Sequence, residues 1–491
     1  MKKRIERKKY GILWALLLLG LTGLGAQEGS QPNIIYIMTD DQGYGDLACH
    51  GHPFLETPNL DKLYAESTRF TDYHVSPTCA PTRAALMSGR NPFEVGVTHT
   101  ILERERLAPG VPTVAEVLKK AGYTTGIFGK WHLGESDEYQ PGSRGFDEVF
   151  IHGAGGIGQN FAGSQGDVPG NDYFDPTIRH NGVFKKTRGY CTDVFFNQAL
   201  GWLKEQNEKP FFAYIATNAP HGPFIVGDEY RDKYLDQVDG DKDAASFFGM
   251  ITNVDDNVGL LVEKLEEWDL ADNTLLIFTT DNGSSKGSRV FNAGMKGGKG
   301  SVNQGGSRVP LFFRLPGVTN PGRDISHLAR HIDIFPTFAE LAGADISDLE
   351  LEGRSLVPLL KDTGKEWSDR NLFFHGGRWP KEGAGKRFGK GDPNPDSYKY
   401  KKFAVRSKKW RLVGTDNLFD IENDPGEENN VIAGNPEVAI ELRKAYEVFW
   451  EKARPLMVNE DAPLDVEKPF EANYLKQKEA GGIPEWTPFE L

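Results

Sequence analysis

The side chain best suited to covalent chemistry is Cys79, which lies in the run SPTCAPTRAALMSGR. Pro81 suits the first turn of a helix and good helix formers follow it, so we predict that Cys79 begins a helix. Free backbone amides and the helix dipole at that end favour negative charge, so the thiol would be reactive even without modification. Arg83 follows one helical turn later and can fold back on the nucleophile.

Polar side chains follow four apolar runs that we predict as buried strands. The runs span residues 33–39, 124–129, 211–217 and 274–280. The polar residues after them are, in order, Asp40 and Asp41, Lys130 and His132, His221, and Asp281 and Asn282. Ligands of open α/β sheets bind at the carboxyl ends of the strands, so we expect these groups to share one rim.

Strands that alternate with helical stretches predict an α/β sheet with helices on both faces. We predict helices at residues 111–121, 195–206, 247–268, 334–342 and 436–453. Residues 399–406, 409–413 and 418–420 predict antiparallel strands with exposed basic faces. The chain therefore divides into a main domain at 32–364, a smaller C-terminal subdomain at 365–455 and a surface-wrapping tail at 456–491, an organisation that its 491 residues allow.

The first residues resemble a targeting segment. A basic stretch at residues 2–9 precedes an apolar stretch at 11–21, and small residues follow at Gly23, Gly25 and Ala26. This order predicts a signal peptide at residues 1–26 and a secreted or periplasmic protein without a membrane anchor after cleavage. The alternative, an uncleaved anchor, is disfavoured because the apolar stretch is short for a spanning helix.

Charge and cysteine content narrow the classes of partner. The net charge of −13 disfavours binding to nucleic acid or anionic membranes, so an anionic substrate needs a local basic pocket. Three cysteines are too few for a disulfide framework. Pairing of Cys49 with Cys191 stays open, and simple burial of each is the favoured alternative.

Six motifs in a fixed order resemble the formylglycine-dependent sulfatases of the alkaline-phosphatase superfamily. They are NIIYIMTDDQGYGDLACHG, CAPTRAALMSGR, GKWHLG, NAPHGP, TTDNG and GGKGSVNQGGSRVP, and LFDIENDPGEENN resembles the C-terminal signature of that family. The resemblance covers residues 32 to about 430. It implies a large, mostly parallel mixed sheet sandwiched by helices, and a smaller C-terminal α+β subdomain with an antiparallel sheet.

The resemblance also implies a metal site. The ligands of one Ca²⁺ would be Asp40, Asp41, Asp281 and Asn282, and this oxygen-rich set suits a hard cation. Taken singly, Asp-Asp and Asp-Asn-Gly are ordinary turn sequences. Their joint occurrence beside Cys79 favours metal, with Mg²⁺ as the weaker alternative.

The remaining catalytic roles come from the same resemblance. A maturation enzyme, either formylglycine-generating or anaerobic, would oxidise Cys79 to an aldehyde that hydrates to a diol. One hydroxyl attacks sulfur and the second loses its proton as sulfate is expelled, which divides the reaction into two steps. Arg83 would hold the diol, Lys130 and Lys299 would bind sulfate, His132 would accept the proton and His221 would protonate the leaving group.

One residue departs from the family pattern. The family commonly has Glu where Gln304 stands, and a neutral amide there would alter how the loop of Lys299 is held.

Other segments offer candidate substrate residues. A glycine-rich loop at 152–159 follows an apolar turn and, with residues 171–174, is predicted to line the pocket wall. His152, His375, Arg378 and Trp379 are candidate substrate residues. A Trp beside an Arg suits stacking on a sugar and pairing with an anion, although a structural corner with a buried Trp explains it as well.

These observations favour a hydrolase that removes sulfate from a sulfated carbohydrate. One alternative is a secreted phosphatase or phosphodiesterase of the same superfamily, but those enzymes usually carry Ser or Thr as nucleophile and more His ligands. The other is a non-catalytic protein that binds sulfated glycans, which requires the loss of a catalytic group, and none of these groups is missing from the sequence.

Overall fold

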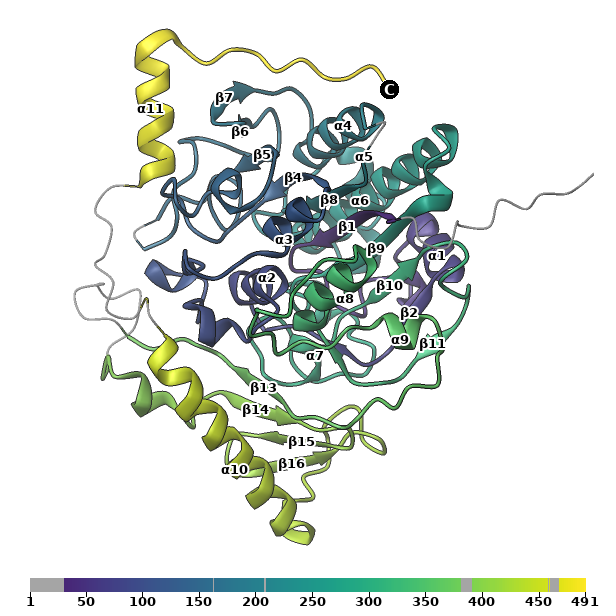
Figure 1. Ribbon diagram of the computed structural model, residues 1–491, viewed down its shortest axis with the longest axis vertical. Coiled ribbons are helices and arrows are strands. Elements are labelled where there is room, and N and C mark those ends of the chain that lie inside the picture. The colour runs from purple at the N-terminus through teal and green to yellow at the C-terminus, as the bar shows by residue number, and fades with distance from the viewer. Residues whose placement is uncertain (1–30, 162, 207–208, 381–390, 458, 460–467) are drawn as a thin grey trace, which may run out of the picture.

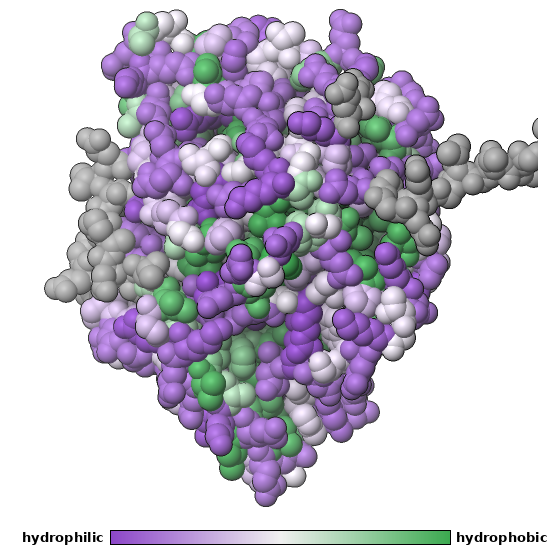
Figure 2. All heavy atoms as spheres, viewed as in Figure 1, coloured by the Kyte–Doolittle hydropathy of each residue, from purple (hydrophilic) through white to green (hydrophobic). Residues whose placement is uncertain are grey.

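A computed structural model describes residues 31–161, 163–206, 209–380, 391–457, 459 and 468–491 (Figure 1). The predicted signal peptide at 1–26 lies outside the described residues. Within the described ranges, no helix is both long and apolar enough to span a bilayer. Figure 2 shows a mainly hydrophilic face, with hydrophobic residues gathered toward the middle of the view.

The main part of the molecule is a ten-stranded sheet in the order β11-β2-β10-β9-β1-β8-β4-β5-β6-β7. Its centre is five parallel strands: β9 (Thr274–Thr280), β1 (Asn33–Thr39), β8 (Phe211–Ala216), β4 (Thr124–Lys130) and β5 (Glu148–His152). The flanking strands are β11 (Asp324–Ile325), β2 (Thr68–Phe70), β10 (Leu311–Arg314), β6 (Thr177–His180) and β7 (Val183–Lys186). A small separate pair joins β3 (Tyr73–His74) to β12 (Ala329–Arg330).

Helices cover both faces of this sheet because its central strands are apolar on both sides. Ile35 and Ile37 of β1 belong to the core on one face, with α1 (Pro58–Glu66), α4 (Cys191–Lys204) and α6 (Lys242–Glu267). Ile34 and Tyr36 belong to the core on the other face, with α2 (Cys79–Ser88), α3 (Val114–Lys120) and α8 (Ile334–Leu341). Short helices are α5 (Asp228–Arg231), α7 (Gln304–Ser307) and α9 (Val357–Leu360).

A second sheet forms the C-terminal part. It is antiparallel in the order β13 (Leu372–His375), β14 (Phe403–Arg406), β15 (Trp410–Val413) and β16 (Asn417–Asp420). Helix α10 (Pro436–Ala453) packs on it around a core that includes Phe403, Leu412 and Trp450 (Figure 1). The predicted exposed basic faces are wrong, because Arg406 and Arg411 are buried and the neighbouring lysines lie in turns.

The fold class is confirmed, and the differences from prediction have local causes. The predicted helix at 111–121 begins only at Val114, because Thr113 and Glu116 form a capping box. The helix predicted at 247–268 begins earlier, at Lys242, because the Asp241 side chain caps it through the amide of Ala244. The apolar turn before the glycine-rich loop is strand β5, and β13 was not predicted.

The tail contains one further helix, α11 (Pro469–Gly481), which the sequence analysis did not predict. Phe470 and Tyr474 of this helix join the core of the main sheet through Phe184 of β7. The chain then pairs Glu485 with Lys186 and passes along α4. The boundaries proposed between the domains stay predictions.

Candidate active site

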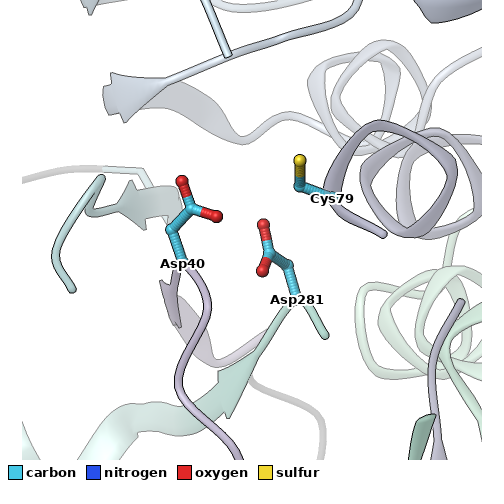
Figure 3. A group of neighbouring side chains, drawn as sticks. All are labelled: Asp40, Cys79 and Asp281. Carbon is cyan, nitrogen blue, oxygen red and sulfur yellow. The ribbon is translucent and has the colours of Figure 1, made fainter. Parts of the chain in front are cut away.

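Cys79 is the first residue of α2, and its side chain is only 3% exposed. Its sulfur and one carboxylate oxygen from each of Asp40 and Asp281 all lie within 4.8 Å of one another. Figure 3 shows the three side chains converging, with Cys79 coming from the helix and each aspartate from the end of a strand. The topology thus brings together residues that are about 40 and 200 positions apart in the chain.

Arg83 forms hydrogen bonds with one carboxylate of this cluster and with the backbone beside it. Its Nε and Nη2 atoms donate to Oδ2 of Asp281 at 3.1 and 2.7 Å, and Nη1 donates to the backbone oxygen of Lys130 at 3.1 Å. Neither charged side chain is exposed. Burial alone would lower the pKa of Arg83, but Tyr214, Asp281 and Asp40 act more strongly together and raise it, so the guanidinium stays charged.

The four predicted metal ligands lie together at the ends of β1 and β9. The backbone amide of Asp41 donates to Oδ1 of Asp281 at 3.2 Å, and Nδ2 of Asn282 donates to Oδ1 of Asp41 at 2.9 Å. Asp40 Oδ1 and Asn282 Oδ1 are buried and have no hydrogen-bond partner among the described residues. Burial, followed by the charge of Asp281, raises the pKa of Asp40. Oxygens left without partners in an acidic cluster fit a hard divalent cation.

Two lysines that were predicted to bind sulfate contact the acidic cluster. Lys130 Nζ lies 2.6 Å from Oδ2 of Asp40, and Lys299 Nζ donates to Oδ2 of Asp41 at 2.7 Å. Burial would raise the pKa of Asp41, but Lys299 and His221 lower it below its usual range. His221 Nε2 lies 3.8 Å from the same carboxylate. The cluster therefore has a cationic side where an anion can bind.

His132 is paired with a carboxylate that the sequence analysis missed. Its Nε2 lies 2.7 Å from Oε2 of Glu105, and both side chains are buried. Burial is the main cause that lowers the pKa of His132 to about 4 and raises that of Glu105 to about 7. The sequence ILERERL gives no chemical sign that distinguishes Glu105 from its neighbours, so only the fold reveals the contact.

The glycine-rich loop packs directly on the two histidines. A Cβ atom at Gly155 would lie 2.5 Å from Cε1 of His132, and one at Gly156 would lie 2.8 Å from Nδ1 of His221. Any larger residue at either position would displace a ring. The loop therefore lines the site, as predicted, although its contacts are with the histidines.

The loop that carries Lys299 is held by the C-terminal sheet. Arg411 of β15 donates to Val302 O at 3.1 Å and to Ser307 Oγ at 2.9 Å. Glu427 pairs with Arg411 at 3.3 Å, and its Oε2 accepts from the Gln304 amide at 2.8 Å. Gln304 itself is buried. The C-terminal signature segment thus supports a residue of the main site.

The four candidate substrate residues fall into different environments. Trp379 is 1% exposed within the C-terminal core, and His375 bonds to Tyr398 O and the Gly377 amide, so both fit the structural-corner interpretation. His152 is buried beside Lys130 in the register of β4 and β5. Of the four, only Arg378 is exposed.

All three cysteines lie within the described residues, and none forms a disulfide. Cys191 is buried and its Sγ lies 2.9 Å from Oδ1 of Asn218, while Cys49 is partly exposed. The expected burial is therefore found for Cys191 and only in part for Cys49, and the two cysteines do not pair.

Comparisons with known proteins find similar sequences along most of the chain. A family model described as Sulfatase matches residues 32–344, and one described as N-sulphoglucosamine sulphohydrolase, C-terminal, matches residues 299–449. Arylsulfatase A of Bos taurus is 32% identical, covering 88% of this chain and 89% of its own. N-acetylgalactosamine-6-sulfatase of Canis lupus familiaris is 33% identical, covering 74% and 72%.

A solved structure extends the likeness to the fold. The crystal structure of Ps i-CgsB in complex with k-i-k-neocarrahexaose superposes with a TM-score of 0.75 at 28% identity, covering 91% of this chain and 98% of that one. These matches identify the protein as a sulfuric ester hydrolase. The chain belongs to the sulfatase family, as the six motifs indicated.

Proposed function

We propose that this protein removes sulfate from a sulfated carbohydrate through a formylglycine hydrate made from Cys79. The observation that carries the proposal is the position of Cys79, at a helix N-terminus and within 4.8 Å of two of the carboxylates at the proposed metal site. A nucleophile in this place lies beside both the cation and the lysines that would bind the sulfate. Oxidation of Cys79 needs a maturation enzyme as a partner.

The other residues receive the roles that the resemblance implies. Arg83 orients the nucleophile and the metal-side carboxylates, and Lys130 and Lys299 bind sulfate oxygens. His221 protonates the leaving alcohol, and His132 accepts the proton that is lost as sulfate leaves. The contacts of Lys130 with Asp40 and of Lys299 with Asp41 support a position next to the bound anion.

We propose Ca²⁺ as the cation, held by Asp40, Asp41, Asp281 and Asn282, with Mg²⁺ as the alternative. When bound, it would stabilise the negative charge that develops on the sulfate oxygens. We expect prolonged dialysis against a chelator to abolish sulfate release and added Ca²⁺ to restore it. Restoration by Mg²⁺ alone, with none by Ca²⁺, would contradict the choice of ion.

The substrate class rests on relatives and on one exposed side chain. The similar proteins include an N-acetylgalactosamine-6-sulfatase, and a similar structure was solved with a neocarrahexaose. A secreted or periplasmic location, which we propose from the signal sequence, suits polysaccharides or their oligosaccharides. We propose that the protein binds no nucleic acid and, after signal cleavage, no membrane.

Arg378 is the residue we expect to meet the sugar. It is exposed and has no hydrogen bond or ion pair with a described residue, while Gly377 beside it packs against Thr98 near the site. Arg378→Ala should raise the KM for a sulfated oligosaccharide about two- to fivefold, the effect of one exposed ionic contact. Its KM for a small aryl sulfate should not change, and an equal rise for both would contradict a sugar contact.

The test of the proposed function is peptide mass spectrometry across Cys79, on protein from its native host, together with a sulfate-release assay. An aldehyde at residue 79, with release abolished in Cys79→Ala, is the expected result. An intact thiol and no release from folded protein with Ca²⁺ present would refute the mechanism and favour a binding protein. Release of phosphate in preference to sulfate would favour a phosphatase.

A further inference from the structure

Glu105 is held in one orientation by contacts at both carboxylate oxygens. It ends the 3-10 turn Leu102–Glu105, and its side chain is 1% exposed. Oε2 contacts His132 Nε2 at 2.7 Å, and Oε1 accepts from the backbone amide of Gln165 at 3.0 Å. The side chain of Gln165 also donates to the backbone oxygen of Glu105 at 3.3 Å. A carboxylate fixed in this way defines the direction of its partner ring.

The contact of Nε2 with Glu105 leaves Nδ1 of His132 available to accept a proton. The backbone of His132 has a positive φ of 59°, and the close approach of Gly155 limits ring rotation. Nδ1 is buried and has no hydrogen-bond partner among the described residues. When Nε2–H donates to Glu105, Nδ1 carries the lone pair and can accept a proton.

We propose that Glu105 is a positioning residue, which fixes the ring and tautomer of His132 so that Nδ1 accepts the proton of the second step. The proposal rests on the formylglycine mechanism proposed above. It assigns Glu105 no contact with substrate.

The second step releases sulfate from residue 79. Residue 79 carries one hydroxyl and one sulfate ester on the same carbon, and His132 Nδ1 takes the hydroxyl proton. The O–H electron pair becomes the second bond of the carbonyl, the bond from carbon to the ester oxygen breaks, and sulfate leaves with that electron pair. The imidazolium that forms is stabilised by the Glu105 carboxylate. Water then adds to the aldehyde and the imidazolium loses its proton.

The electrostatics agree with a base that begins neutral. Burial, acting first, and the nearby charges of Lys130 and Arg83 lower the pKa of His132, while Glu105 raises it. The charge of Glu135 helps to raise the pKa of Glu105, and the charge of Glu105 acts to raise the pKa of Lys468. Removal of the Glu105 charge therefore makes protonation of the ring harder and removes the carboxylate that fixes its tautomer.

The test compares Glu105→Gln with Glu135→Gln. Glu135 is a matched control because it is also buried and accepts from the Phe470 amide at 3.1 Å, without a contact to His132. We expect Glu105→Gln to lower kcat by about 10²–10⁴-fold and to lower KM with it, so that kcat/KM for alcohol release changes little, because only the second step is slowed. Rapid-mixing assays should show a burst of one alcohol per active site, and intact mass spectrometry should show sulfate retained on residue 79. The control should do neither.

Several outcomes distinguish the two proposals. Wild-type protein without sulfate release refutes the proposed function itself. Wild-type turnover with no burst and no retained sulfate in Glu105→Gln refutes the role of Glu105, even when overall activity falls, because a purely structural defect would slow both steps. If Glu105→Gln does not fold, Glu105→Asp, which keeps the charge but reaches less far, must give the same retained sulfate.

Discussion

The buried pair of Arg83 and Asp281 places two full charges where no solvent reaches them. Removing one partner leaves the other charged or forces it to take up a proton in the interior. Arg83→Met should therefore lower the free energy of unfolding by about 3–5 kcal/mol and abolish activity.

Urea denaturation measures this loss. Arg188→Met is the control, because the Arg188 side chain is 85% exposed and its nearest carboxylate oxygen, on Glu485, is 3.9 Å away. A change of similar size in both variants would contradict the assignment of the cost to the buried pair.

His375 predicts a pH dependence at a single residue. Burial lowers its pKa from 6.5 to about 4, so the folded state disfavours the charged ring. The unfolded chain binds a proton near pH 6.5 while the folded protein does not, so the stability is present above pH 6.5 and is lost as pH falls toward 4. The loss should reach about 3 kcal/mol at pH 4.

His375→Gln keeps hydrogen-bonding capacity but cannot titrate. Urea denaturation of both proteins between pH 7.5 and 4.5 should therefore show a shallower fall of stability for the variant. Parallel curves over this range would contradict the buried, neutral ring.

Single functional residues could be predicted from the sequence where residues suited to the same chemistry are neighbours in the chain. The grouping of the acidic residues could be predicted because they occur as neighbours at strand ends, such as Asp40 with Asp41 and Asp281 with Asn282. Glu105 could not be predicted, since it reaches His132 only through the folding of a surface-like charged stretch into the interior. Trp379 was a candidate substrate residue, but it is buried. An Arg-Trp pair in the sequence suits a sugar site and a buried corner equally, so the sequence could not distinguish them.

Among the elements, the central strands were the most predictable. Strands β1 and β9 have the predicted bounds because each is a continuous apolar run buried on both faces. The edge strands and β13 have no such run, and α11 contributes few apolar residues, so their positions depend on tertiary contacts. The order of the ten strands also could not be read from the sequence.

The contact between β15 and the Lys299 loop predicts an effect on catalysis from outside the main sheet. Glu427 is buried and bridges Arg411 to the Gln304 amide. Glu427→Gln should lower the free energy of unfolding by about 3–5 kcal/mol, because Arg411 loses its buried counter-charge. It should also lower kcat by about 10²-fold, because the loop of Lys299 shifts.

Glu428→Gln is the matched control, since its side chain is exposed one residue further on. Denaturation and sulfate release measure the two effects. Normal kcat in a destabilised Glu427→Gln protein would show that the contact supports the fold without setting the position of Lys299.

At the scale of the whole molecule, helix α11 packs the C-terminal part of the chain against the main sheet. Phe470 is 1% exposed, packs edge-on against Phe184 and lies against Gly153, where the glycine-rich loop begins. Phe470→Ala should cost about 3–5 kcal/mol of stability, the usual range for deletion of a buried ring.

Leu475→Ala on the same helix is the control, because Leu475 is 42% exposed. Its unfolding free energy should change by less than about 0.5 kcal/mol, as expected for a surface position. Equal effects in the two variants would show that α11 contributes through its helical structure and not through the buried ring.

The hold of Arg411 and Glu427 on the Lys299 loop has a consequence for how such a chain can evolve. A gene that exchanged its C-terminal part by recombination after residue 364 would keep the whole large sheet yet lose the contacts that hold the Lys299 loop. An incoming segment would have to hold that loop in another way, with a matching pair of charges or with apolar packing. The C-terminal sheet and the main sheet are therefore expected to be exchanged together and not separately.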